Sequence, residues 1–181
     1  MTNYNFNDRP SEARVSTLKA EFPNVDSQLV VTFINFQWTY REMQRQYDRL
    51  LASYELSESK FLILMFLRQA HKQQLLPSVL AEKLGATRPT VSKLLTGLSK
   101  QSFVKKIGNA RDKRSSLIQL TEAGNEVLKD LLPYNFTAPQ LIFEDFSADE
   151  LQYFEHLLEK INQGTQKLKT EMENLHNERK N

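Results

Sequence analysis

The sequence predicts a mainly α-helical chain that carries one β-hairpin near its middle. Three observations support this fold class. Glycine and proline are scarce, with 5 and 6 among 181 residues, which favours long helices over a turn-rich β architecture. Apolar side chains recur at helical spacing near both ends of the chain. Between these helical regions, two extended segments flank a polar turn.

The composition excludes several classes of protein. A hydrophobic fraction of 40% and a charged fraction of 25% are typical of a globular chain with a core. The chain has no cysteine, which excludes disulfide frameworks, thiolate zinc sites and cysteine-based redox sensing. No apolar run approaches the roughly 18 residues of a membrane span, and the N-terminus lacks a secretory signal. We therefore expect a cytoplasmic protein that does not associate with membranes.

A long helix is predicted after a polar, aperiodic N-terminal arm, residues 1–25. Asp26 can cap this helix. Apolar residues then alternate at spacings of four and three, which is a heptad-like pattern. They are Leu29, Phe33, Phe36, Tyr40, Met43, Tyr47 and Leu50. Burial in the chain's own core explains part of this stripe, but its length favours a partner helix from a second chain.

Two shorter helices are predicted next. Ser57 can cap a helix running from Phe61 to about Ala70, which is apolar almost all round and therefore centrally buried. Pro77 suits the first turn of a short third helix. Gly85 ends that helix, because a left-handed residue is favoured there.

A fourth helix and a hairpin complete the middle of the chain. Thr87 can cap this helix, whose inner face is apolar at helical spacing. The outer face carries Arg88, Thr90, Ser92, Lys93 and Thr96. Residues 103–107 and 116–120 are predicted strands, and residues 108–113 are predicted to form the turn between them.

The C-terminal third is predicted to be helical. Thr121 can cap a fifth helix, which Pro133 and Pro139 are expected to kink or break. A capping box, Ser147 to Glu150, opens the last helix. Its stripe comprises Leu151, Phe154, Leu158, Ile161, Thr165, Leu168, Met172 and Leu175.

The predicted division is an N-terminal arm (1–25), a dimerisation helix (26–56), a winged helix-turn-helix domain (57–120) and C-terminal dimerisation helices (121–181).

Positive charge concentrates in the middle of the chain. Between Leu76 and Leu120 nine cations face two acids, a net charge of +7, whereas the whole chain carries +2 and the remainder therefore −5. The cations are Lys83, Arg88, Lys93, Lys100, Lys105, Lys106, Arg111, Lys113 and Arg114; the acids are Glu82 and Asp112. This distribution indicates a nucleic-acid partner.

The fourth helix has the residue types that contact DNA. A helix fits the major groove, where Arg88 can pair bidentately with guanine. Lys93 and Lys100 are placed for phosphates, which provide affinity without sequence information. The candidate DNA-binding residues here are Thr87, Arg88, Pro89, Thr90, Ser92, Lys93 and Thr96. The alternative is a merely solvated helix face.

The hairpin tip is a second candidate contact. Arg111, Lys113 and Arg114 can enter the minor groove, whose negative potential attracts arginine. Asp112 would repel phosphate unless paired, so we interpret it as an orienting partner for Arg114. The alternative is a surface ion pair between these two residues.

These motifs resemble the MarR (multiple antibiotic resistance regulator) family of winged helix-turn-helix regulators. The resemblance rests on the capped helix, on Asp112-Lys113-Arg114 in the wing, and on Leu120-Thr121-Glu122-Ala123-Gly124 after it. It covers roughly Asp26 to Lys169. One departure is Ser102, where the family often has glycine. Overall, the sequence predicts a mainly α, winged helix-turn-helix fold with a two-stranded β-wing, flanked by long N- and C-terminal dimerisation helices.

The resemblance implies a two-fold homodimer on double-stranded DNA. The first helix and the last two would form the interface, and the half-sites of a pseudo-palindromic operator would lie about one DNA turn apart. It also implies a repressor released by a phenolic or other amphipathic small molecule. Candidate lining residues are Phe36, Trp38, Tyr40, Phe61 and Met65. Aromatic residues of this kind more often belong to a core or an interface than to a ligand site.

Other functions have less support in the sequence. His156 and Glu159 lie one helical turn apart, but with His71 and His176 elsewhere we expect no metal site and no cofactor. No nucleophile stands near a histidine and no glycine-rich phosphate loop is present, so we expect no enzyme. Two alternatives to the ligand-responsive repressor remain: a ligand-independent or architectural DNA-binding regulator, and a winged-helix protein-interaction module.

Overall fold

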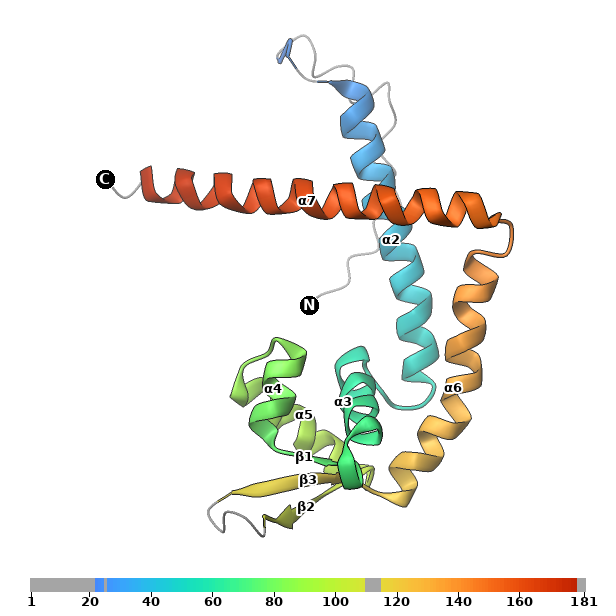
Figure 1. Cartoon of the computed structure of the whole chain (residues 1–181), viewed down its shortest axis with the longest axis vertical. Coiled ribbons are helices and arrows are strands. Elements are labelled where there is room, and N and C mark those ends of the chain that lie inside the picture. The colour runs from blue at the N-terminus through green and yellow to red at the C-terminus, as the bar shows by residue number, and fades with distance from the viewer. Residues whose placement is uncertain (1–21, 25, 110–114, 179–181) are drawn as a thin grey trace. The chain divides into compact units, whose positions relative to one another are not determined.

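A computed structural model describes residues 22–24, 26–109 and 115–178 (Figure 1). The chain divides between Asn135 and Phe136 into two compact units. In chain order the elements are α2 (Ser27–Ala52), α3 (Glu58–Gln69), the 3₁₀ turn η2 (His71–Gln73), β1 (Gln74–Leu75), α4 (Pro77–Leu84), α5 (Arg88–Lys100), β2 (Val104–Gly108), β3 (Ser116–Leu120), α6 (Glu122–Ile142) and α7 (Ala148–Glu178). The predicted class, mainly α with a β-wing, is confirmed.

The helices begin where their capping residues predict. Asp26 Oδ1 accepts a hydrogen bond from the Leu29 amide at 3.1 Å, at the start of α2. The Ser57 and Thr87 side chains do the same for the amides of Lys60 and Thr90, at 3.4 Å each. Each cap satisfies an amide that has no partner within its helix, which fixes the first residue of α2, α3 and α5.

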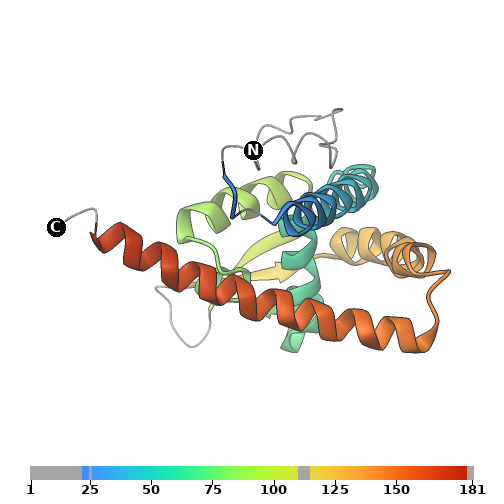
Figure 2. The same cartoon turned by 90° about the horizontal axis from the view of Figure 1, so that it is seen from above.

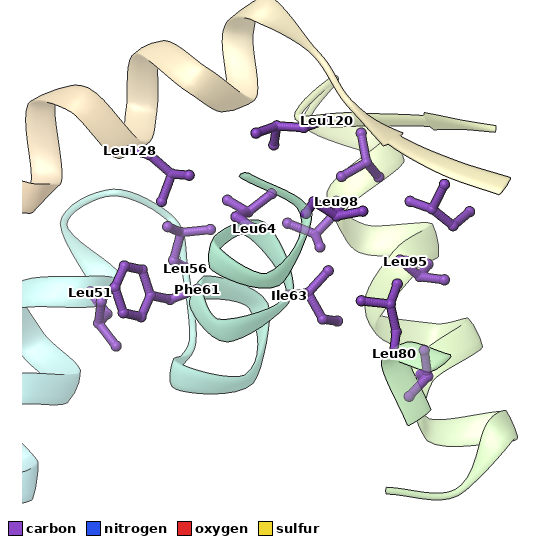
Figure 3. Packing of buried hydrophobic residues seen from close by; sticks show 14 of the residues in the cluster. Leu51, Leu56, Phe61, Ile63, Leu64, Leu80, Leu95, Leu98, Leu120 and Leu128 are labelled. Atoms are coloured by element: carbon purple, nitrogen blue, oxygen red, sulfur yellow. The ribbon is translucent and has the colours of Figure 1, made fainter. Parts of the chain in front are cut away.

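The hydrophobic core of the first unit surrounds α3. Ile63, Leu64 and Leu67 are fully buried, as the continuous apolar run predicts. Figure 3 shows side chains from the neighbouring elements converging on this helix. They include Leu51, Leu56, Leu80, Leu95, Leu98, Leu120 and Leu128. Burial of each of these leucines contributes about 1.5–3 kcal/mol to the free energy of unfolding. The neighbouring elements are therefore held in place by their packing against α3.

The sheet has three antiparallel strands in the order β1-β3-β2. The β2–β3 hairpin pairs Val104 with Leu120 at its base and Gly108 with Ser116 near its tip. It lies one residue later in its first strand than the sequence predicts. The additional strand β1 pairs Leu75 with Ile118 and was not predicted, because two residues are too short to show a periodicity.

Pro133 and Pro139 do not break α6, which corrects one part of the prediction. The helix runs from Glu122 to Ile142 across both residues (Figure 1). Proline removes one amide donor and crowds the preceding turn, at a cost of about 3 kcal/mol or more. Before the first proline, the buried Leu128 and Leu131 anchor α6 in the core. Tertiary packing on these leucines offsets the local preference for an ended helix.

A polar contact joins α2 to α6 within the first unit. The Tyr47 hydroxyl donates a 2.6 Å hydrogen bond to Asn135 Oδ1. Partial burial, and secondly the negative charge of Glu58, raise the pKa of Tyr47 above its usual value. The raised pKa favours the protonated hydroxyl, which is the form that donates to Asn135.

The start of α6 is fitted closely to the end of α5. The Thr121 hydroxyl donates to Ser102 O at 2.6 Å and accepts from the Gly124 amide at 3.1 Å. The Thr121 amide donates to Phe103 O at 3.1 Å. A Cβ added to Gly124 would lie 2.6 Å from Leu120 Cδ1 and closer still to Phe103 O. Thr121 and Gly124 of the Leu-Thr-x-x-Gly sequence are therefore required by this joint.

Replacing Ser102 with glycine is expected to stabilise the fold. Ser102 has φ +61°, in the left-handed region that side chains disfavour by about 1–2 kcal/mol. The gain is partly offset because glycine loses more entropy on folding, so Ser102→Gly should raise the free energy of unfolding by about 0.5–1 kcal/mol. Urea denaturation at fixed protein concentration measures this change. Ser99→Gly, inside the last turn of α5, is the control and should destabilise; a loss of stability in Ser102→Gly as well would contradict the strain argument.

The second unit contains the end of α6 and the single long helix α7 (Figure 2). The predicted capping box is present, with the Ser147 amide donating to Glu150 Oε2 at 2.9 Å and the Glu150 amide donating to Ser147 Oγ at 3.3 Å. Hydrogen bonds from the Ser147 amide and hydroxyl lower the pKa of Glu150. None of the helices in the described part of the chain has both the length and the apolar character needed to cross a membrane.

Candidate nucleic-acid interface

Helices α4 and α5 form a helix-turn-helix held on the core. α4 ends at Gly85, whose φ of +60° and ψ of 30° give the left-handed conformation that glycine adopts freely. The Ala86 amide bonds back to Ala81 O at 3.0 Å, and the chain turns directly into α5. Val91 and Leu98 of α5 are buried at 1% and 0% exposure. The inner face of α5 is thus fixed, and its outer face is presented to solvent.

All seven candidate DNA-binding residues of this segment lie exposed on one stretch of chain. They are Thr87, Arg88, Pro89, Thr90, Ser92, Lys93 and Thr96. The Thr87 and Thr90 hydroxyl oxygens lie 2.8 Å apart. The Thr96 hydroxyl donates to Ser92 O at 2.9 Å, so its proton is engaged within the helix. Thr96 therefore presents an acceptor and a methyl group outward.

A polar cluster that the sequence did not reveal positions the far end of α5. Gln101 follows the last residue of α5, and its Nε2 donates to Glu55 O at 2.9 Å. Lys60 Nζ, from α3, donates to Gln101 Oε1 at 2.8 Å and to Glu55 O at 3.3 Å. A Cβ on Gly97 would lie 3.3 Å from Lys60 Cε, so a glycine allows the lysine stem to cross α5 closely. Glycine inside the helix was the only signal in the sequence.

The wing continues the basic surface. Lys105 and Lys106 on β2 are exposed. Asn109 Nδ2 donates to Ser115 Oγ at 2.8 Å, which closes the hairpin just before its tip. The predicted tip residues Arg111, Asp112, Lys113 and Arg114 lie outside the described residues. Their roles in DNA binding stay predictions.

The five candidate ligand-lining residues lie in two different environments. Phe36 and Tyr40 are exposed on α2, and Trp38 is partly exposed there. Phe61 of α3 is buried in the core and Met65 packs against it. The structure does not therefore bring all five onto one surface. Among the described residues, no group of three or more histidine, aspartate or glutamate side chains is arranged to hold a metal ion.

Comparison with known proteins agrees with this arrangement. A family model described as "MarR family" matches residues 54–115, which contain α3, the helix-turn-helix and the first wing strand β2. The transcriptional repressor YetL of Bacillus subtilis is 30% identical over 149 residues, which cover 82% of this chain and 89% of YetL. The chain belongs to the MarR family. The repressor MprA of Escherichia coli is 25% identical to it over 114 residues, covering 63% and 65% of the two chains.

Solved structures share the fold of this MarR family member. Sco3205 of Streptomyces coelicolor, determined in complex with DNA, superposes with a TM-score of 0.65 at 21% identity, covering 77% of this chain and 87% of the other. A mutant of MarR from E. coli, in complex with operator DNA, gives 0.62 at 20% identity, covering 76% and 98%. These likenesses show that the chain has the same overall fold as these structures.

Proposed function

We propose that this MarR family member is a sequence-specific DNA-binding transcriptional repressor that acts as a homodimer in the cytoplasm. The observation that carries the proposal is the outer face of α5, where the polar or basic residues Arg88, Thr90, Ser92, Lys93 and Thr96 are exposed on a helix whose inner face is buried. A rigidly held helix of this kind enters the major groove. The names of the relatives and the DNA complexes of the structural neighbours support the same assignment.

We assign the contacts of α5 from the positions and chemistry of its residues. Arg88, in the first turn, would pair with a guanine edge, whereas Lys93 would contact phosphate. Thr96 offers its methyl group to a thymine, because its hydroxyl proton is bonded to Ser92 O. Arg111, Lys113 and Arg114 would extend the interface into the minor groove, with Asp112 orienting Arg114.

The homodimer would cover apolar surface that a single chain leaves exposed. On α2, Leu29 and Phe33 are 67% and 57% exposed, and Phe36, Tyr40 and Met43 continue the stripe. An apolar stripe of this length on a helix is typical of an interface. We therefore assign residues 26–56 and 121–181 to dimerisation and residues 57–120 to DNA binding, after an N-terminal arm of residues 1–25.

The second part of the proposal is release by an amphipathic or phenolic ligand. The exposed aromatic side chains of Phe36 and Tyr40 on α2 suit such a molecule, as does the partly exposed Trp38. No enzymatic activity and no cofactor is needed for this function. A thermal-shift screen with phenolic acids and lipophilic cations tests the ligand; no stabilisation would favour the ligand-independent regulator instead.

Gel shifts over a salt series test DNA binding itself. A duplex selected from a random pool by the wild-type chain is the probe. Counterion release predicts that the affinity for DNA falls by about tenfold or more when the salt concentration rises from about 50 to about 200 mM. Arg114→Ala should weaken binding by about tenfold at matched salt, while Lys129→Ala, an exposed substitution on α6, should not. No binding at low salt, or no salt dependence, would favour the protein-interaction module.

A further inference from the structure

The turn that joins α3 to β1 contains two successive residues in the left-handed conformation, and neither is a glycine. Lys72 has φ 55° and ψ 19°, and Gln73 has φ 53°. Side chains disfavour this region because Cβ comes too close to the following carbonyl oxygen. Such a conformation persists only where the surrounding structure holds it, and it is concentrated at functional positions. Contacts of the turn must therefore offset its strain.

A reciprocal pair of side-chain amides ties this turn to α6. Gln73 Nε2 donates to Asn125 Oδ1 at 3.2 Å, and Asn125 Nδ2 donates to Gln73 Oε1 at 3.0 Å. Both side chains are partly buried, although the residues lie 52 positions apart in the sequence. Because each amide both donates and accepts, the pair fixes the orientation of the two side chains as well as their separation. A glycine at position 73 would avoid the strain but could not form this pair.

The backbone on each side of the amide pair is itself fixed. The Gln73 amide donates to Ala70 O at 2.9 Å, directly after α3. The Asn125 amide donates to Thr121 O at 2.9 Å, at the start of α6. The Thr121 hydroxyl in turn donates to Ser102 O, just beyond the end of α5. The side-chain pair therefore connects two well-held pieces of backbone.

The turn leads directly into the helix-turn-helix. Gln74 of β1 pairs with Gln119 of β3, the second strand of the wing. Leu76 is the N-cap residue of α4, which begins at Pro77, and its side chain makes no capping hydrogen bond. Only three residues thus separate Gln73 from the first helix of the helix-turn-helix. The position of the start of α4 depends on how this turn is held.

We infer that Gln73 and Asn125 are positioning residues for DNA recognition. Their pair holds the start of α4 on α6, and the tight turn at Gly85 passes this orientation on to α5. The inference rests on the DNA binding of the proposed function and adds to it two residues outside α5 and the wing. Neither residue carries a charge, so breaking the pair removes no attraction to phosphate. The pair should therefore contribute to the preference for one sequence and not to the binding of DNA in general.

Gel shifts on two duplexes of equal length test this role. The selectivity ratio is the affinity for the selected duplex divided by that for a random one. Gln73→Ala and Asn125→Ala should each lower the affinity for the selected duplex by about fivefold to tenfold, and leave that for the random duplex within about twofold. Because the two residues act as a unit, the double alanine variant should lose no more than either single variant. Additive losses would overturn the inference.

Gln69→Ala is the matched control for the alanine variants. Gln69 is an exposed glutamine at the end of α3, one helical turn before Gln73. This variant should keep the wild-type selectivity ratio. A loss of selectivity in Gln69→Ala equal to that in Gln73→Ala would show that the amide pair has no special role.

An exchange of the two side chains separates positioning from a direct contact with DNA. Gln73→Asn shortens one side of the pair by one methylene and Asn125→Gln lengthens the other, so each single exchange should lower the selectivity ratio. The double exchange restores the summed length and should recover the wild-type ratio to within about twofold. Circular dichroism at the binding temperature identifies any alanine variant that is unfolded, and the double exchange then decides. A folded double exchange that stays as weak as the single variants would refute the positioning role.

The wild-type chain distinguishes this inference from the proposed function. A wild-type chain with equal affinity for both duplexes would refute sequence-specific DNA binding itself. A wild-type chain that prefers the selected duplex, with the same selectivity ratio in every variant of Gln73 and Asn125, would refute the positioning role alone.

Discussion

Gly124→Ala is expected to lower the free energy of unfolding by about 3 kcal/mol or more. The added Cβ would overlap Phe103 O and lie 2.6 Å from Leu120 Cδ1. The clash with Phe103 falls on a backbone carbonyl, which already accepts the Thr121 amide and cannot move independently. Relief would require shifting the start of α6 or the start of the wing. Thermal unfolding should show a midpoint about 6–12 °C lower.

Gly108→Ala is the matched control for this substitution. Gly108 lies at the end of β2, and a Cβ there meets nothing within 4 Å. The free energy of unfolding of Gly108→Ala should differ from that of the wild type by no more than about 0.5 kcal/mol. Both variants must be compared at the same protein concentration, because dimerisation contributes to apparent stability. If both substitutions lowered the free energy of unfolding by the same small amount, the backbone around Gly124 would be able to move enough to accept a Cβ, and the predicted clash would be wrong.

Arg88→Ala is expected to weaken binding to the selected duplex by about tenfold to a hundredfold. This is the loss of affinity expected when one bidentate arginine–guanine pair is removed. Arg88 is exposed in the first turn of α5, the part of a helix that enters the major groove. Because the proposed contact of Arg88 is to a base, the loss should be largest on the preferred sequence and small on random DNA. Gel shifts with both duplexes at one salt concentration measure the difference.

Lys93→Ala separates base contacts from phosphate contacts. A phosphate contact carries no sequence information, so this variant should weaken binding to both duplexes by a similar factor and reduce the salt slope by about 1. Lys129→Ala on α6 should affect neither duplex. If Arg88→Ala also weakened both duplexes equally, Arg88 would be a phosphate contact, and the assignment of sequence recognition to this residue would be wrong.

Much of the fold was predictable because its signals are local. Asp26, Ser57 and Thr87 bond to amides three residues ahead, so each capping sequence identifies its own helix start. Gly85 similarly ends α4 through its own backbone conformation. The exposed face of α5 followed from the same periodicity that placed its inner face in the core.

The features that escaped prediction depend on distant parts of the chain. Strand β1 exists only because β3 offers it a pairing edge more than forty residues later. The cluster of Glu55, Lys60 and Gln101 joins three segments through polar side chains that have no periodic signature. The continuity of α6 across Pro133 depends on core leucines that outweigh a local rule.

The joint at Ser102, Thr121 and Gly124 has a mechanical consequence. Together with the Lys60–Gln101 contact, it ties α5 at its far end to α3, to the wing and to the first turn of α6. A helix held in this way cannot rotate or slide by itself, so each DNA-binding unit should move as one rigid piece. Any adjustment to operators with longer or shorter spacers must then arise in the interface between two copies. Substitutions there should change spacer tolerance without altering base preference.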